Sequence, residues 1–368
     1  MFRSLRQLVR ALCSKKRPFR KRDKGCGVGI GNQLSPLGAH EDILTNISPD
    51  MCFSGGNFAG WQSNARSVLA ELLGEIQLES LEKQVEIWES EDKRGKYFKQ
   101  VLSGAHGGRI PIYRCCLHET DPPRGWIICL QGHTTGMHVS LGIDAHEEYR
   151  LETPGDRDLV SWCLEVGYGA YCMEVRSLGA RQETVQPRIA PHPCQDAAMR
   201  SLLLGRTLMG ERLNDIASLA DYIHRVENVP HQHIGVLGNS LGGTLAIYSA
   251  ALLEQVGFAV ASSCVSSFRE SIFRIYHCTD LYIPGILQRL EFGDIIGLAA
   301  PKPVLLVHGV KDEIFPLRGF RAAYQQGKRI YRAATASDRL RVELGMGGHR
   351  FYSELSKDTF RHLMSTRG

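Results

Sequence analysis

Residues 234–243 read Ile-Gly-Val-Leu-Gly-Asn-Ser-Leu-Gly-Gly, and they give the strongest indication of the fold. The apolar run 234–237 has the length of a buried strand, and an apolar helical segment begins near Leu241. Between them lies Gly-x-Ser-x-Gly, which permits a tight strand-to-helix turn that lifts the serine hydroxyl above the sheet. Because the chain has 38 glycines, the motif alone is weak, and the flanking strand and helix carry the prediction that Ser240 is a nucleophile.

Strands and helices alternate on both sides of this turn. We expect strands at 126–130, 170–175, 234–237, 259–265, 304–307 and 340–343, and helices at 158–165, 195–226, 240–253, 318–326 and 352–364. Apolar strands that alternate with helices indicate an α/β fold, in which a mostly parallel central sheet has helices on both faces. Ligands of such sheets bind at the carboxyl ends of the strands, so the chemistry is expected in the loops there.

The remaining sequence divides into a leader and the beginning of one large domain. Residues 1–49 are interpreted as a basic, disordered leader, and 50–368 as a single domain with its catalytic core at 126–368. Its first part, 61–117, contains a helix with apolar residues at helical spacing and strand-like segments at 85–88, 97–102 and 109–117. No run approaches the roughly 18 apolar residues that a membrane-spanning helix needs.

The leader carries the positive charge of the chain. Ten lysine and arginine residues and one aspartate lie within residues 1–24, which gives this segment +9, whereas the whole chain carries +5. Three interpretations stay open: a solvated tail, an organellar targeting segment or peripheral contact with an anionic membrane, and a nucleic-acid-binding arm, which we do not expect. A secretory signal is not expected, because no apolar segment with a small-residue cleavage site follows.

The cysteines and histidines predict neither a metal nor a disulfide framework. The 11 cysteines are scattered without a Cys-x-x-Cys pair, which favours reduced thiols and a cytoplasmic location, with organellar targeting as the alternative. No His-Glu-x-x-His, phosphate-binding loop or dinucleotide-binding glycine motif lies between a strand and a helix, so we expect no metal and no cofactor. The sequence leaves the oligomeric state open.

A serine nucleophile needs a general base, and the base needs an acid that orients it. Asp312 follows the predicted strand 304–307, and His349 follows the predicted strand 340–343 in a glycine-rich loop. The order serine, acid, histidine is the one expected when the nucleophile stands on a strand-to-helix turn of this kind. We therefore predict a Ser240–Asp312–His349 triad, in which the rivals are Glu313 for the acid and His362 for the base.

The developing oxyanion needs two backbone donors. Leu241 supplies the N–H group directly after the nucleophile, and His133, in the glycine-containing turn after strand 126–130, supplies the second. The imidazole of His133 could equally line the pocket. We expect His308 to be a packed structural residue, and His277 and Cys278 to belong either to the pocket lining or to the core.

Several further motifs resemble the α/β-hydrolase superfamily, in particular its acetyl xylan esterase and dienelactone hydrolase branch. The resemblance covers Trp61 to the C-terminus and rests on the triad and on segments 131–133, 174–179, 204–207 with 210–211, 282–285 and 299–303. Gln131 stands where relatives have histidine, and Glu174 where they have aspartate, which changes the polarity of the pocket. The resemblance implies an α/β-hydrolase fold and cleavage of a small carboxylic ester, such as a sugar acetate or a lactone, through an acyl-serine intermediate without a cofactor. Gln131, Arg176 and Tyr282 are then expected to contact this small-molecule substrate.

Two other functions stay open. The same machinery could cleave amides, as in a peptidase or amidase, although no repeat domain of the oligopeptidase type precedes the catalytic part. The chain could also be a non-catalytic relative that binds a ligand. The presence of all three triad residues favours retained catalysis.

Overall fold

A computed structural model describes residues 35–104, 108–118, 122–146, 154–183 and 193–365. The chain divides into two compact units, residues 1–47 and 48–368. The described part of the first unit is mainly one helix, α3 (Pro36–Asn46), and the second unit holds the sheet and all other helices described below. The basic and amphipathic segment at 1–24 lies outside the described residues.

Helix α3 corrects the prediction that the leader is disordered up to residue 49. Ser35 caps its first turn, since the serine hydroxyl accepts a hydrogen bond from the Leu37 N–H group, and Pro36 occupies the first helical position. A serine cap followed by proline is a strong start signal for a helix. The charged and glycine-rich residues before it led to the prediction of disorder instead.

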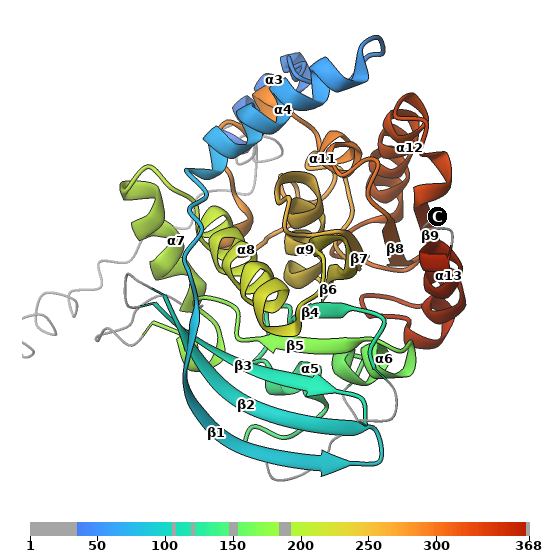
Figure 1. Cartoon of the computed structure of the whole chain (residues 1–368). Coiled ribbons are helices and arrows are strands. Elements are labelled where there is room, and N and C mark those ends of the chain that lie inside the picture. Colours follow the sequence, from blue (N-terminus) through green and yellow to red (C-terminus); the bar gives the residue numbers. More distant parts are fainter. Residues whose placement is uncertain (1–34, 105–107, 119–121, 147–153, 184–192, 366–368) are drawn as a thin grey trace, which may run out of the picture. The chain divides into compact units, whose positions relative to one another are not determined.

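The second unit is built on one nine-stranded sheet with the order β1-β2-β3-β5-β4-β6-β7-β8-β9. The first three strands form an antiparallel meander, which joins β5 in antiparallel pairing, and all later neighbours are parallel. Figure 1 shows the meander curving away along one edge of the sheet. The strands are β1 (Glu82–Asp92), β2 (Gly95–Ser103), β3 (Arg109–Cys116), β4 (Trp126–Leu130), β5 (Gly169–Met173), β6 (Ile234–Asn239), β7 (Phe258–Ser262), β8 (Val304–Gly309) and β9 (Leu340–Gly345).

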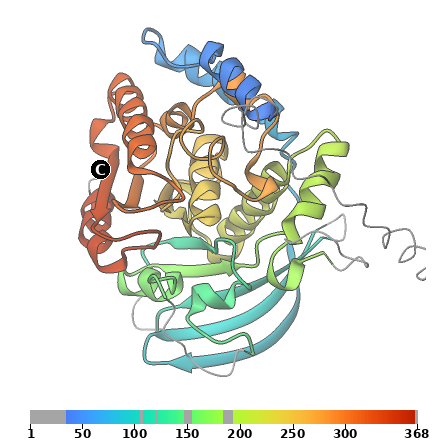
Figure 2. The same cartoon turned by 180° about the vertical axis from the view of Figure 1, so that it is seen from behind.

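Helices cover both faces of this sheet, and the expected α/β-hydrolase fold is confirmed (Figures 1 and 2). Alternate residues of the central strands serve the two cores: Ile128 faces one, whereas its neighbours Ile127 and Cys129 face the other. The first core is covered by α4 (Phe58–Leu73), α8 (Leu208–Glu227), α9 (Leu241–Leu252), α11 (Phe292–Leu298) and α12 (Leu317–Ala333), and the second by α5 (His138–Leu141), α6 (Leu159–Glu165) and α13 (Ser353–Ser365).

The predicted helix at 195–226 is two helices, α7 (Pro193–Leu203) and α8. Gly205 between them has a φ of +71°, a left-handed conformation that breaks a helix and suits glycine. Thr207 then caps α8, because its hydroxyl accepts a hydrogen bond from Gly210 N–H at 3.0 Å. This break lets α7 turn toward the short helix η3 (Thr279–Leu281), with which it packs.

Several short elements were not predicted from the sequence. They are η1 (Gly179–Arg181), η2 (His231–His233), α10 (Ile286–Arg289) and η4 (Ser337–Arg339), together with α5, α11 and η3. Within the described part of the chain, no helix is both long and apolar enough to cross a membrane.

Candidate active site

Ser240 stands on a sharp turn between β6 and α9. Its φ of +58° and ψ of −120° are strained for a residue with a side chain. The serine N–H group donates to Ser262 O on β7 at 2.8 Å, and the serine carbonyl accepts from Thr244 N–H on α9 at 2.9 Å, so β7 and α9 hold the turn in place. The predicted strand, turn and helix are therefore all present, and the strain is concentrated on the proposed nucleophile.

Glycines surround this turn because backbone crosses backbone there. A Cβ atom on Gly238 would overlap the main chain of Gly242, and one on Gly242 would overlap the carbonyl of Leu130. Neither position has room for any other residue. The sequence pattern Gly-x-Ser-x-Gly is thus explained by the packing of β6, α9 and β4.

The proposed acid and base meet through their side chains. His349 Nδ1 lies 2.8 Å from Asp312 Oδ2, and the other carboxylate oxygen accepts hydrogen bonds from Ile314 N–H at 2.9 Å and Phe315 N–H at 3.0 Å. The ring of Phe315 stacks on the imidazole with centroids 5.9 Å apart. Both the position and the tautomer of His349 are therefore set by Asp312, as a general base requires.

Backbone hydrogen bonds bring the two loops together. Val310 N–H donates to Gly345 O, and Lys311 N–H donates to Gly347 O, both at 2.9 Å. The loop after β8 therefore runs alongside the loop after β9. Because these strands are parallel neighbours, residues 37 positions apart in the sequence come into contact.

A second set of bonds ties the histidine loop to the strand beside the nucleophile. The carbonyl of Arg350 accepts from Ser262 Oγ at 3.2 Å and from Ser263 Oγ at 2.8 Å. Ser262 O in turn accepts the N–H of Ser240. The end of β7 is thus a common support for the nucleophile turn and for the residue that follows His349.

The charge state of Asp312 suits its proposed role. Burial by itself would raise the pKa of the carboxyl, but the hydrogen bond and charge of His349 and the N–H groups of Phe315 and Ile314 lower it below its usual value. Asp312 is therefore ionised at neutral pH and can stabilise an imidazolium. Its rival Glu313 is exposed.

The other histidines fit the roles expected of them. His308 is fully buried and stacks on Phe320 with centroids 4.2 Å apart, which makes it a packed residue. His277 is buried and bonded to Ser271 Oγ at 2.9 Å. His362, the rival base, is exposed on α13.

The predicted oxyanion turn lies against the nucleophile. A Cβ atom on Gly132 would be 2.9 Å from Asn239 O and 3.1 Å from Ser240 Cβ, so the glycine allows the backbone to approach the serine closely. His133 follows directly, and its backbone N–H remains our predicted second donor beside Leu241. The imidazole of His133 has a different role, because its Nε2 lies 3.0 Å from Asp280 Oδ2.

Glu174 supports the same turn through hydrogen bonds. This buried carboxylate accepts hydrogen bonds from the Gln131 side chain, from Met137 N–H at 3.1 Å and from Ala180 N–H at 3.2 Å. Burial raises its pKa, although these donors lower it in part. The Gln131 side chain is buried and its amide nitrogen is bound to Glu174, so its contact with the substrate stays a prediction.

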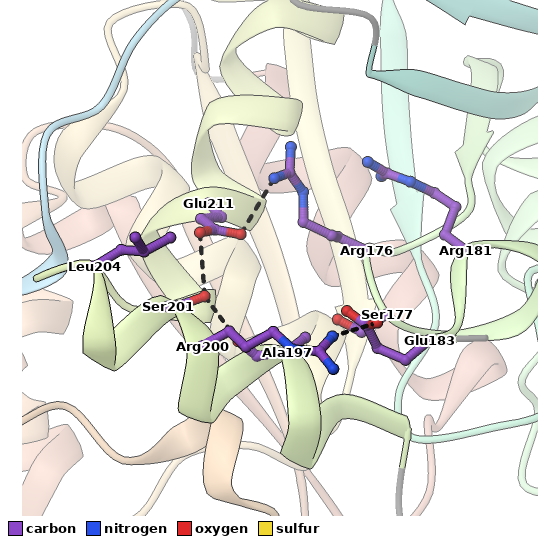
Figure 3. Close-up of a pocket in the computed structure, with 9 residues that line it drawn as sticks. All are labelled: Arg176, Ser177, Arg181, Glu183, Ala197, Arg200, Ser201, Leu204 and Glu211. Carbon is purple, nitrogen blue, oxygen red and sulfur yellow. Dashed lines mark hydrogen bonds and ion pairs between the residues drawn. The ribbon is translucent and has the colours of Figure 1, made fainter. Parts of the chain in front are cut away.

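Arg176 is also committed elsewhere. Its guanidinium pairs with Asp215 at 2.6 Å and with Glu211 at 3.2 Å, and it lines a polar pocket of about 210 Å³ under α7 (Figure 3). None of the triad residues lines that pocket. Two carboxylates hold the Arg176 guanidinium in this pocket, and a contact of Arg176 with the ester substrate stays a prediction. The third residue, Tyr282, is partly exposed in the loop after β7, where a substrate contact stays a prediction.

A buried ion pair behind His133 was missed from the sequence. Asp280 and Arg212 are both without exposed side-chain surface and pair at 2.5 Å. Burial alone would raise the pKa of Asp280, but Arg212 and His133 hold it well below its usual range. No local signal marks either residue, because one lies inside α8 and the other in the short helix η3, 68 positions later.

Two cysteines also meet at this place. Cys194, in the first turn of α7, forms a disulfide with Cys278, which lies 84 residues later. The expectation of reduced thiols throughout is therefore wrong for this pair, whose long separation left no spacing signal in the sequence. Seven other cysteines are free among the described residues.

Comparisons with known proteins agree with this geometry. The sequence profile of the acetyl xylan esterase (AXE1) family matches residues 145–329, which are half of the chain. The Bacillus subtilis protein YtaP, provisionally named a hydrolase, is 26% identical over 203 residues, which are 54% of this chain and 64% of that protein. The match thus spans less than two thirds of that relative.

Solved structures share the fold. A Bacteroides fragilis protein, provisionally described as an acetyl xylan esterase, superposes with a TM-score of 0.69 at 14% identity, over 88% of this chain and 89% of that one. A glucuronoyl esterase from Teredinibacter turnerae gives 0.60 at 13% identity, again over 88% and 89% of the two chains. The predicted superfamily and branch are confirmed, and the matches support the predicted class, an ester-cleaving hydrolase.

Proposed function

Because the chain belongs to the acetyl xylan esterase family, we propose that it hydrolyses carboxylic esters of small acyl groups through an acyl-serine intermediate. The observation that carries the proposal is the bond between His349 Nδ1 and Asp312 Oδ2, in loops supported by the same strand end as the Ser240 turn. Such an arrangement can hold an imidazole ready to accept a proton from a serine hydroxyl.

In the first half-reaction, Ser240 Oγ attacks the ester carbonyl while His349 Nε2 accepts the hydroxyl proton. The backbone N–H groups of Leu241 and His133 stabilise the oxyanion, and His349 then gives the proton to the leaving alcohol. In the second, His349 removes a proton from water, which attacks the acyl-serine and releases the carboxylic acid. Asp312 remains ionised throughout and stabilises the imidazolium.

A small acyl group on a sugar, or a lactone, is the substrate class that the family favours. The same groups could act on an amide, and a chain without turnover could still bind a ligand. A strained nucleophile with an oriented base favours catalysis over binding, because nothing in ligand binding requires this strain.

The test is hydrolysis of p-nitrophenyl esters from acetate to octanoate, with acetyl p-nitroanilide as the matched amide. We expect turnover that declines with chain length, little amide cleavage, and labelling by a fluorophosphonate. Ser240→Ala should abolish labelling and lower kcat by roughly 10⁴-fold or more. Turnover that survives in Ser240→Ala, or absence of both turnover and labelling in the parent protein, would refute the proposal.

A further inference from the structure

Four side chains with metal-ligand atoms converge beside the oxyanion turn. One ligand atom from each of His133, Cys194, Cys278 and Asp280 lies within 4.8 Å of all the others. Three separate segments supply them: the turn after β4, the start of α7, and η3 with the residue that precedes it. Among the described residues, these four form the group of histidine, cysteine and acidic side chains whose ligand atoms lie close enough together to hold a metal ion.

The donor set has the chemistry of a zinc site. Two sulfurs, one imidazole nitrogen and one carboxylate oxygen are ligands that Zn²⁺ binds in a tetrahedron, at about 2.0–2.3 Å from the metal. Donors that lie within 4.8 Å of one another need only small shifts to reach a central ion. The Cα atoms of Cys194 and Cys278 are 7.4 Å apart. Disulfides usually span about 4.4–6.8 Å between these atoms, so the wider spacing leaves room for an ion between the sulfurs.

The charge around the four side chains fits a divalent cation. Two cysteine thiolates and the Asp280 carboxylate would bring three negative charges, and the buried guanidinium of Arg212 lies 2.5 Å from Asp280. With Zn²⁺ and a neutral His133, the positive and negative charges cancel. A buried group of ionised ligands is tolerated only when it is balanced in this way.

Access and ligand orientation also favour an ion here. Cys194 and Asp280 are buried, whereas the His133 side chain keeps 31% of its surface exposed, which gives an ion a route from solvent. Its imidazole already points at Asp280, with Nε2 between 3.0 and 3.2 Å from the carboxylate oxygens. An ion bound to both groups would replace that hydrogen bond.

We propose that, when Cys194 and Cys278 are reduced, these two residues bind a structural Zn²⁺ together with His133 and Asp280. A thiol reductant supplies the two electrons and two protons that convert the disulfide into two thiols, and the reductant becomes a disulfide. Binding of Zn²⁺ then releases the two thiol protons to solvent. The disulfide and the zinc site are thus alternative states of one cluster, selected by the redox conditions.

The metal would have a positioning role. Four protein ligands fill a tetrahedral zinc and leave no open position for a water nucleophile, so Ser240 keeps its proposed role. Zinc on the His133 imidazole would fix the turn that carries our predicted oxyanion donor, and would link this turn to α7 through Cys194.

The test measures metal directly, so its outcome is independent of esterase activity. The full chain and Ser240→Ala are reduced with a phosphine, exposed to Zn²⁺, freed of excess metal by gel filtration and analysed by mass spectrometry. We expect about one zinc per chain in both. With Co²⁺ instead, we expect thiolate-to-cobalt charge-transfer absorption. Chelator competition should show more than about 100-fold weaker zinc binding in Cys194→Ser and Cys278→Ser, because each lacks a ligand.

The matched control is Cys52→Ser, which removes an exposed cysteine outside the cluster and should keep the zinc. His133→Gln retains the backbone N–H group and should weaken zinc binding in the same direction as the cysteine variants. The proposal is overturned if alkylation shows that Cys194 and Cys278 are free thiols but no metal is retained, or if their disulfide resists reduction. Cobalt binding without thiolate absorption would overturn it equally.

Discussion

His349 Nδ1 lies 2.8 Å from Asp312 Oδ2, across 37 residues of sequence. This bond fixes the imidazole tautomer. Asp312→Asn should place an amide N–H donor against Nδ1 and so favour the wrong tautomer. We expect kcat for p-nitrophenyl acetate to fall about 10⁴-fold with little change in KM. The control is Glu313→Gln at the exposed neighbour, whose activity should match the parent. An equal loss in both variants would contradict the assignment of the acid.

Gly132 tests the oxyanion turn. In Gly132→Ala the new methyl group would meet Asn239 O at 2.9 Å and Ser240 Cβ at 3.1 Å, which forces the turn away from the nucleophile. We expect kcat to fall on the order of 10²–10³-fold, the size of effect seen when one oxyanion donor is lost. Gly38→Ala, where the methyl meets no described atom within 4 Å, is the matched substitution and should leave kcat unchanged.

Glu174 tests the support of that turn. Glu174→Ala removes the acceptor of Gln131, Met137 and Ala180, and each buried donor left unpaired costs about 1–3 kcal/mol. Glu174→Gln keeps one carbonyl oxygen and should lose less. Urea unfolding of the parent protein and of both variants measures these losses. If all three proteins are equally stable, these hydrogen bonds contribute nothing.

Arg212 and Asp280 form a buried ion pair. Arg212→Met leaves the Asp280 carboxylate unpaired and should lower the free energy of unfolding by about 3–5 kcal/mol. In Arg212→Met/Asp280→Leu both charges are gone, so part of the loss should be recovered. If the double variant loses as much stability as Arg212→Met and Asp280→Leu lose together, the pairing argument fails.

His308 predicts how stability depends on pH. Burial lowers its pKa to about 4, and that of His277 also falls to about 4, whereas an unfolded histidine titrates near 6.5. The unfolded state therefore binds more protons between these values. The stabilising contribution of these two neutral histidines is fully present above about pH 6.5 and is lost as the pH falls toward 4. His308→Leu should reduce the slope of the free energy of unfolding in this window, and an unchanged slope would contradict the prediction.

The sequence was sufficient for the fold and for choosing the candidates for the triad. Apolar strands of 5 or 6 residues, such as β4 and β6, can be recognised from the pattern and length of a single run of adjacent residues. The glycines at 238 and 242 mark a turn that no other residue can form. Parallel strands place their carboxyl ends at one edge of the sheet, so residues that follow such strands, as Ser240, Asp312 and His349 do, are expected on that same edge.

The sequence did not reveal the hydrogen-bond partners of two residues that we predict to contact the substrate. Gln131 and Arg176 stand in motifs shared with relatives, but their hydrogen-bond partners, Glu174 and Asp215, lie on other elements. A motif gives the position of a residue along the chain. The direction of its side chain depends on the acceptor that is nearest after folding.

What the sequence alone determined was therefore local: strand and helix periods, the nucleophile turn and the chain order of the catalytic candidates. Only the tertiary structure brought Cys194 to Cys278 and Arg212 to Asp280, pairs that are 84 and 68 residues apart. Their contacts depend on how α7, α8 and the loop after β7 pack together. Long-range packing has no period and no fixed spacing, so nothing in the neighbouring residues records it.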